Sequence, residues 1–163
     1  MTEKEKIHME SQDKFLSNFD ALDFPNLGLI RLPEVKIDSK YKKELKLSDG
    51  CSNYEFLCVL VKKGLTEKKH KLPKERLTEY FERVDFELNI FEELGFTDYV
   101  LLVWLVVNKI REFGGFVDFG RGSNGASFVF ALLGVTGILD VIDKGMIFER
   151  FVSKTRSRKQ IIN

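Results

Sequence analysis

The sequence has few residues of the two types that most often bind transition metals. Its 163 residues include two cysteines and two histidines. Cys51 and Cys58 have no second cysteine pair beside them, and His8 and His70 are isolated in the sequence. Because a structural zinc site needs about four such ligands, the sequence argues against one. We interpret both cysteines as buried or half-buried thiols in a reducing compartment.

Long apolar runs are also missing. The most apolar stretch covers residues 99–107 and falls well short of the roughly 20 residues that a membrane-spanning helix requires. Residues 1–14 are charged throughout and lack the apolar segment of a secretion signal. We therefore expect a cytoplasmic protein without a membrane partner.

The composition is otherwise typical of a soluble globular protein. Hydrophobic residues make up 44% of the chain and charged residues 31%, and the length suffices for one domain with a core of its own. Fifteen phenylalanines against one tryptophan indicate a core packed with aromatic rings. The formal net charge of +1 identifies no partner, because a charge near zero can hide local patches.

The first 75 residues give the weakest signals of regular structure. Residues 1–14 are polar and are expected to form a disordered tail. Residues 15–75 contain Pro25 and Pro33, which interrupt any long helix. We expect this second stretch to act as a connector that packs against another part of the protein.

One helix is predicted inside the connector, from residue 52 to residue 63. Ser52 is a suitable N-cap, and Glu55 follows three positions later, as in a capping box. Gly64 is a suitable end for this helix. Residues 65–74 are basic, contain a proline and are expected to form a loop.

Two further helices are predicted after the connector. The first covers residues 76–94 and ends at Gly95, and the second covers about 97–112 with Thr97 or Asp98 as its N-cap. The centre of the second helix is apolar on nearly every side, so we expect it to be buried, with Trp104 as a core ring. The apolar residues that recur at helical spacing in the first helix and predict its buried face are Leu77, Phe81, Val84, Leu88 and Phe91.

The sequence GRGSNGAS, at residues 120–127, lies between a predicted short strand over 116–119 and a predicted helix over 126–134. Backbone N–H groups at a helix N-terminus have no partner inside the helix, and they attract anions. Glycines let the main chain approach such an anion closely, while Arg121 and Ser123 add a charged donor and a hydroxyl donor. The pattern fits a phosphate site, and it fits a tight turn that binds nothing equally well.

Gly120, Gly122 and Gly125 also match the dinucleotide-binding pattern G-x-G-x-x-G, and Asp140 stands near the position of the acidic residue that holds the ribose. That pattern normally opens its domain, whereas only 38 of the 163 residues follow Gly125. A kinase glycine loop fits less well, because it needs strands on both sides. A dinucleotide-binding protein is therefore a remote alternative.

Four blocks follow one another between residues 80 and 151. They are YFERVDFELNIFEELGF, GFTDYVLLVWLVVNKIREFGG, GRGSNGASFVFALLGVTGI and DKGMIFERF. In this order they resemble the catalytic subunit of bacterial C-family replicative DNA polymerases, the DNA polymerase III alpha subunit, in a phage-like version. The stretches LPEVKIDSKY and CSNYEFLCVLVKKGL are more faintly similar to the junction between the family's phosphoesterase-like domain and its palm.

The resemblance implies a fold and a division of the chain. The fold is α/β and α-rich, a partial palm of the polymerase-beta-like nucleotidyltransferase type, with several helices plus a short strand–glycine turn–helix unit. The tail at 1–14 precedes a junction-like connector at 15–75 and the N-terminal part of the palm at 76–163. A half palm of this kind is expected to expose an apolar face and an unpaired sheet edge.

The resemblance also implies what the glycine turn binds. In the family's palm a glycine–serine turn holds the triphosphate of the incoming nucleotide, and an arginine of FERF lies nearby, where a cation offsets charge that develops in phosphoryl transfer. A second arginine stands at the family's spacing, although SKT at 153–155 replaces the family's Asn-Pro-Glu. The residues that the resemblance assigns to the triphosphate are Gly120, Arg121, Gly122, Ser123, Arg150 and Arg156.

The family's metal-binding aspartates are expected beyond residue 163. They bind two Mg²⁺ ions in the complete polymerase, and Asp118, Asp140 and Asp143 do not stand in matching contexts. We therefore assign no catalytic or metal-binding residue to this chain and expect no polymerase activity from it alone. The expected partners are a deoxynucleoside triphosphate, primer–template DNA and the remaining C-terminal part of the polymerase, in the cytoplasm of a bacterium or a phage-infected host.

A palm remnant that binds DNA or a replisome partner without catalysis is the main alternative. Lys154, Arg156, Arg158 and Lys159 place four cations within six residues, and such a tail can contact phosphates. A solvated chain terminus explains the same charges equally well.

Overall fold

The computed structural model of the chain describes residues 13–14, 17, 33–118, 120 and 122–154. Contacts divide the chain into two compact units, residues 1–30 and residues 31–163. In the first unit the Ser17 hydroxyl donates to the Lys14 carbonyl at 2.9 Å. The tail predicted over 1–14 lies outside the described residues except for its last two. All elements below belong to the second unit.

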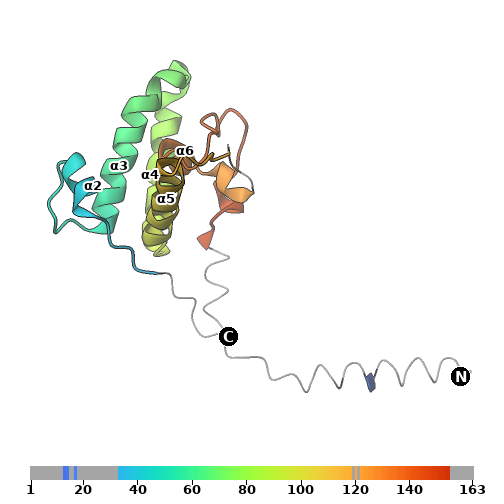
Figure 1. Cartoon of the computed structure of the whole chain (residues 1–163). Helices are drawn as coiled ribbons and strands as arrows, with labels where there is room; N and C mark the ends of the chain where they lie inside the picture. The colour runs from blue at the N-terminus through green and yellow to red at the C-terminus, as the bar shows by residue number, and fades with distance from the viewer. Residues whose placement is uncertain (1–12, 15–16, 18–32, 119, 121, 155–163) are drawn as a thin grey trace, which may run out of the picture. The chain divides into compact units, whose positions relative to one another are not determined.

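Helices form every regular element that is assigned in the described part of this unit (Figure 1). The α-helices are α2 (Ser39–Glu44), α3 (Asn53–Lys68), α4 (Leu77–Glu93), α5 (Thr97–Glu112) and α6 (Phe128–Leu132). Short 3-10 turns join them: η1 (Lys69–Lys71), η2 (Lys74–Arg76), η3 (Ser123–Ala126) and η4 (Phe148–Arg150). None of the described helices is long and apolar enough to cross a membrane.

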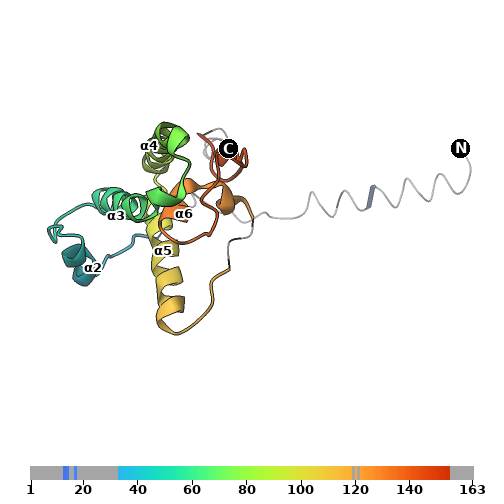
Figure 2. The ribbon, with the colours of Figure 1, turned by 90° about the horizontal axis from the view of Figure 1, so that it is seen from above.

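The short helix α6 lies among the three longer helices (Figures 1 and 2). It packs against both α3 and α4, and α3 also packs against α5. Aromatic rings fill the space between these helices, which confirms the core predicted from the phenylalanine content. The largest rings with less than 2% of their surface exposed are Phe56, Tyr80, Phe91, Phe128, Phe130 and Phe148.

The capping box predicted at the start of α3 is confirmed. The Ser52 hydroxyl accepts from the Glu55 amide at 3.2 Å, and the Glu55 carboxylate accepts from the Ser52 amide at 2.8 Å. The predicted end of this helix is wrong, because α3 continues through Gly64 to Lys68. Much of the stretch expected to form a loop is therefore helical.

Gly64 serves close packing rather than helix termination. It is buried in α3, and a Cβ atom at this position would collide with the carbonyl oxygen of Leu132 in α6. The missing side chain therefore lets the two helices approach at backbone distance. Because α6 follows the glycine turn directly, this contact helps to fix where the turn lies.

We expect Gly64→Ala to destabilise the protein, although alanine is the better helix former by about 1 kcal/mol. The added methyl group must displace backbone, and overpacking of this kind costs about 1–3 kcal/mol. Urea unfolding followed by circular dichroism measures the change. Gly50→Ala is the matched control, because nothing lies within 4 Å of a Cβ atom there. Equal stability of both variants would contradict close packing at Gly64.

The ends predicted for α4 and α5 are confirmed, but the predicted N-cap of α5 is wrong. Gly95 has a φ of 69° and follows α4 with the hydrogen bonds of a helix-ending turn. No side chain caps α5. The carboxylate of Asp98 instead accepts from the Val35 amide at 3.1 Å and from the Asn53 side chain at 2.7 Å. A tertiary contact to the start of α3 has replaced the local cap.

The buried faces of α4 and α5 differ in part from the predictions. Val84, Leu88 and Phe91 are buried as expected, but the Phe81 ring is 43% exposed. Trp104 is buried and packs on two rings, which confirms it as a core residue. However, α5 is not buried on all sides, since Val106 is 49% exposed.

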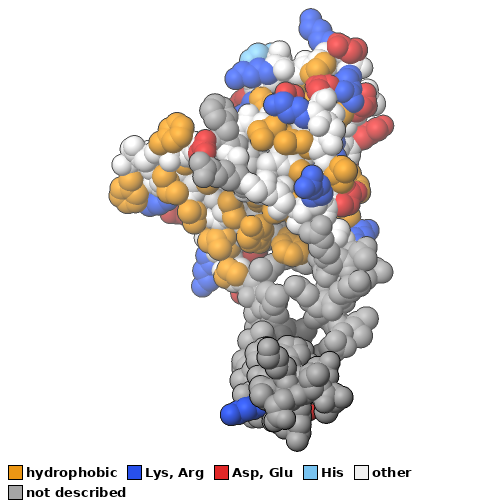
Figure 3. All heavy atoms as spheres, turned by 90° about the vertical axis from the view of Figure 1, so that its right-hand side faces the viewer, with side chains coloured by type: hydrophobic (Ala, Val, Ile, Leu, Met, Phe, Trp, Pro, Cys, Tyr) orange, Lys and Arg blue, Asp and Glu red, His pale blue; other side chains and the backbone are white. Residues whose placement is uncertain are grey.

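Further apolar side chains remain at the surface, at the end of α5 and after it. Phe113 and Phe116 are more than 80% exposed, and Ile110 and Ile147 are at least 40% exposed. Figure 3 shows hydrophobic side chains gathered between scattered charges on the face that it views. Exposed apolar side chains are thus present in the described residues.

The strand predicted over 116–119 is not formed in residues 116–118, which have no regular structure; residue 119 lies outside the described residues. A strand needs a neighbour to accept and donate its backbone hydrogen bonds, and the described part of the chain offers none. The helix predicted over 126–134 is shorter than expected and begins only at Phe128, after η3. The described fold is α-helical rather than α/β.

Candidate functional site

The glycine turn uses backbone conformations that only glycine adopts readily. Gly120 has a φ of 113° and Gly122 a φ of 81°, both in the left-handed region. A Cβ atom at Gly120 would also come within 3.0 Å of the Thr136 methyl group. The chain then enters η3 at Ser123, with Gly122 as its N-cap. These two glycines therefore aim the exposed Ser123 side chain away from the core.

Gly125, the third glycine of the dinucleotide pattern, has a different role. It is buried, and a Cβ atom there would lie 3.3 Å from the Ile138 side chain. Neither a strand before the glycines nor a long helix after them is present in the described residues. The dinucleotide interpretation thus lacks the strand–turn–helix context that it requires.

A cavity of about 660 Å³ opens beside the glycine turn. Its two walls come from segments that are distant in sequence, so that Ser123 and Arg150 face the same space. The cavity is lined by Gly122, Ser123 and Ala126 from one side and by Lys144, Gly145, Met146, Ile147 and Arg150 from the other.

Among the described residues, the two charged ones that line this cavity are basic. They are Lys144 and Arg150, and both are exposed. Lys144 pairs with Asp140 at 3.1 Å, but both side chains are at least half exposed, and ion pairs of this kind are weak. Its ammonium group can therefore turn towards an anion in the cavity at little cost. A cavity with a hydroxyl group and two cations is suited to a phosphate-containing ligand.

The structure places the six residues predicted to bind the triphosphate as follows. Gly122, Ser123 and Arg150 line the cavity together, while Gly120 shapes the turn without lining it. The two remaining residues, Arg121 and Arg156, lie outside the described residues.

The anion site predicted at a helix N-terminus is wrong for α6, because a side chain already occupies the start of this helix. The carboxylate of Glu87, in α4, accepts from the amides of Phe128 and Val129 at 2.9 and 3.0 Å. It also accepts from the Ser127 hydroxyl at 2.6 Å, and that hydroxyl accepts from the Phe130 amide. An external phosphate therefore has no access to these amides.

Arg83 completes this buried network. Its Nε atom donates to the Glu87 carboxylate at 2.6 Å, and Glu87 has no exposed surface. Burial raises the pKa of Glu87, although the hydrogen bonds from Ser127, Arg83 and the α6 amides act in the opposite direction. Sequence reasoning missed both residues. The available signal was a carboxylate on the apolar stripe of α4, one position before Leu88 and four after Arg83.

The loop that carries Lys144 is attached to α4 at a second point. Asp143 accepts from the Tyr80 hydroxyl at 2.8 Å and pairs with Arg76, which also binds Glu79. Burial, together with the nearby Asp143 carboxylate, raises the pKa of Tyr80 to about 12. Helix α4 thus supports both the turn side and the loop side of the cavity.

The described residues do not fit a metal ion. No group of three histidine, cysteine or acidic residues within them could hold one. Asp140 and Asp143 are paired with Lys144 and Arg76, and Cys51 and Cys58 are half-buried free thiols, as predicted. No metal-dependent step can be derived from this part of the chain.

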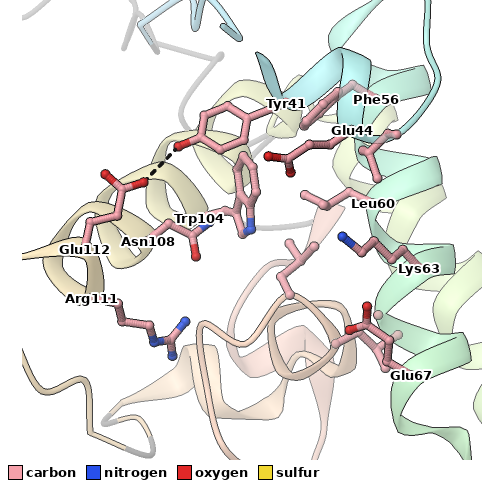
Figure 4. A pocket seen from close by; sticks show the side chains of 14 residues that line it. Tyr41, Glu44, Phe56, Leu60, Lys63, Glu67, Trp104, Asn108, Arg111 and Glu112 are labelled. Atoms are coloured by element: carbon pink, nitrogen blue, oxygen red, sulfur yellow. Dashed lines mark hydrogen bonds between the residues drawn. The ribbon is translucent and has the colours of Figure 1, made fainter. Parts of the chain in front are cut away.

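A second cavity, of about 540 Å³, lies at the opposite end of α6 (Figure 4). The Trp104 ring forms part of its wall, next to Tyr41, whose hydroxyl donates to Glu112 at 3.4 Å. Lys63 and Glu67 from α3 and Arg111 from α5 also line it, so its charges are mixed. This mixture gives no preference for a ligand of one sign.

Cations near the second cavity stabilise the C-terminal end of α6. The Lys68 ammonium donates to the carbonyls of Ala131 and Leu132 at 2.6 and 2.8 Å, and Arg111 donates to the Gly134 carbonyl. Burial lowers the pKa of Lys68. A carboxylate at the start of α6 and cations at its end match the direction of the helix dipole.

Comparison with known proteins identifies the family. Residues 55–160 match the model of the bacterial DNA polymerase III alpha NTPase domain. An error-prone DNA polymerase from Symbiobacterium thermophilum is 36% identical over 131 residues, which cover 80% of this chain and 12% of that protein. The DNA polymerase III subunit alpha of Aquifex aeolicus is 35% identical over 102 residues, or 63% of this chain and 9% of that protein. That of Neisseria meningitidis serogroup A is 38% identical over 114 residues, or 66% of this chain and 10% of that protein.

The chain spans about a tenth of the length of these curated relatives. The family match nevertheless covers both segments that form the cavity beside the glycine turn. It also covers well over half of the 163 residues. The chain therefore belongs to the family of the bacterial DNA polymerase III alpha NTPase domain.

Proposed function

We propose that this chain supplies the triphosphate-binding part of a replicative DNA polymerase palm. In this proposal the cavity beside the glycine turn receives the phosphates of an incoming deoxynucleoside triphosphate. Ser123 donates its hydroxyl group to a phosphate oxygen, and Lys144 and Arg150 supply positive charge. Primer–template DNA and the remaining C-terminal part of the polymerase are the proposed partners, in the cytoplasm.

One observation carries this proposal: residues of the glycine turn and of the FERF segment line one cavity, and its charged residues in the described part of the chain are basic. The cavity volume of about 660 Å³ lies within the range of roughly 300–1,000 Å³ that is usual for small-molecule sites. Membership of a DNA polymerase family makes a nucleotide the natural anionic ligand. Mg²⁺ is proposed for the complete polymerase only, since the described residues do not fit a metal.

We expect the purified 163-residue chain to bind dATP and inorganic tripolyphosphate, and two substitutions to weaken this binding. Loss of a hydrogen bond to a charged group costs about 1.5–3 kcal/mol, so Ser123→Ala should lower the affinity about 10- to 100-fold. Arg150→Ala should lower it about 10- to 100-fold, because a full charge is removed. Isothermal titration calorimetry at low salt measures both effects.

Matched controls and the main alternative are tested in the same experiment. Ser48→Ala and Lys62→Ala remove a hydroxyl group and a positive charge from exposed positions that do not line the cavity, and they should leave the affinity unchanged. If the chain is instead a DNA-binding remnant, its affinity for duplex DNA should fall steeply with salt and survive Ser123→Ala. Equal loss of tripolyphosphate affinity in controls and site variants would overturn the proposed site.

A further inference from the structure

The guanidinium group of Arg83 spans the two walls of the cavity. Its Nη2 atom donates to the Ala126 carbonyl at 3.0 Å and to the Met146 carbonyl at 3.2 Å. Ala126 belongs to η3, on the turn side of the cavity, and Met146 belongs to the opposite wall. One side chain of α4 thus connects two segments that are 20 residues apart in sequence.

Arg83 is itself held in place from two sides. Glu87 pairs with its Nε atom, and the guanidinium carbon lies 5.6 Å from the centre of the Phe148 ring. Because Phe148 begins η4, which carries Arg150, this contact connects Arg83 to the arginine of the proposed site. The side chain of Arg83 is 17% exposed, so its hydrogen bonds are largely shielded from water.

Glu87 connects the same unit to α6. Its two carboxylate oxygens accept hydrogen bonds from Arg83, from the Ser127 hydroxyl and from the first two amides of α6. Ser127 directly follows η3. The direction of the chain as it leaves the turn is therefore determined by a carboxylate that does not line the cavity.

We propose that Arg83 and Glu87 are positioning residues, which hold the glycine turn and the Lys144–Arg150 segment at a fixed separation. Neither residue lines the cavity, so both act through the residues that do. The effect on ligand binding rests on the proposed function, whereas the fixed separation rests on the hydrogen bonds alone. Loss of the Arg83 bridge loosens the two walls relative to each other, so Ser123 and Arg150 no longer hold one phosphate group together as firmly.

Lysine is the informative replacement for Arg83. It keeps the positive charge and can pair with Glu87, but it lacks the planar fork of the guanidinium group. Arg83 uses two separate nitrogen atoms, Nε for Glu87 and Nη2 for the two wall carbonyls, whereas lysine offers a single nitrogen. Arg83→Lys therefore removes the bridge between the walls while it keeps the positive charge. Glu87→Gln is a second variant. It keeps the shape of the side chain and removes its charge, whereas Arg83→Lys keeps the charge and changes the shape.

The test measures both wall movement and ligand binding in the full chain. Hydrogen–deuterium exchange should rise in residues 122–129 and 144–147 together in Arg83→Lys, with α3 unchanged. Affinity for inorganic tripolyphosphate should fall about 10-fold or more. Val61→Ala is the matched control, because Val61 is 1% exposed in α3 and does not line the cavity. It should lower the overall stability without selective exchange in the walls and without loss of affinity in the folded protein.

The outcomes separate this inference from the proposed function. Unchanged exchange of both walls in Arg83→Lys and in Glu87→Gln would overturn the positioning role, even if tripolyphosphate binds. A second outcome is possible, in which hydrogen–deuterium exchange of the walls rises in both variants but the wild-type chain binds no tripolyphosphate. This outcome would support the positioning role and refute the proposed function. If Arg83→Lys does not fold, the exchange pattern of Glu87→Gln decides alone.

Discussion

Replacing Glu87 with alanine is expected to lower the free energy of unfolding by about 3–5 kcal/mol, because removing one partner of a buried ion pair leaves the other charge uncompensated. Arg83 would lose its partner in a site that has little contact with water. The Ser127 hydroxyl and the first two amides of α6 would lose their acceptor as well. Chemical unfolding at pH 7 measures the change.

Glu82→Ala provides the comparison for this prediction. Glu82 lies on the same helix but is exposed, and surface substitutions usually change stability by less than about 0.5 kcal/mol. A loss of stability of this small size in Glu87→Ala would refute the importance of the network.

Phe148→Ala is expected to have a comparable effect, since truncation of a buried phenylalanine costs about 3–5 kcal/mol. The Phe148 ring has no exposed surface and contacts the rings of Phe86, Phe91 and Phe151. It is also the first residue of η4, so the loss should extend to the position of Arg150. Affinity for tripolyphosphate should therefore fall together with the melting temperature.

Phe116→Ala is the matched control for Phe148→Ala, because the Phe116 ring is 85% exposed. It removes the same side chain from a surface position and should leave both stability and tripolyphosphate affinity nearly unchanged. Phe148→Leu should recover most of the stability, since leucine fills much of the same space. A stable Phe148→Ala protein would mean that η4 is held by its hydrogen bonds rather than by this ring.

The features predicted correctly from the sequence are those that neighbouring residues determine. The capping box of Ser52 and Glu55, the bounds of α5 and the glycine after α4 each depend on residues within one or two helical turns. Such local signals survive folding when no distant group competes for the same atoms. Asp98 illustrates the opposite case, because two distant donors bind its carboxylate and leave α5 without a side-chain cap.

The errors arise where a distant contact changes the meaning of a local signal. Glycine is typical of a helix end, but at position 64 the missing side chain allows close packing against α6. Glutamate is typical of a surface position, but Glu87 is buried and accepts hydrogen bonds from donors about 40 residues away in sequence. For the candidate site, the glycine–serine turn and Arg150 were predicted from their motifs, whereas the bridge that Arg83 makes between Ala126 and Met146 could be recognised only from the three-dimensional contacts.

The support of α6 from three helices has a consequence for the order of folding. A five-residue helix is far shorter than the roughly 12–15 residues that an isolated helix needs in water. Its ends are bound by Glu87 from α4, Lys68 from α3 and, just beyond it, Arg111 from α5. We expect these contacts to form only after the three longer helices have come together. The cavity beside the glycine turn is then expected to be completed late, once the surrounding helices are native.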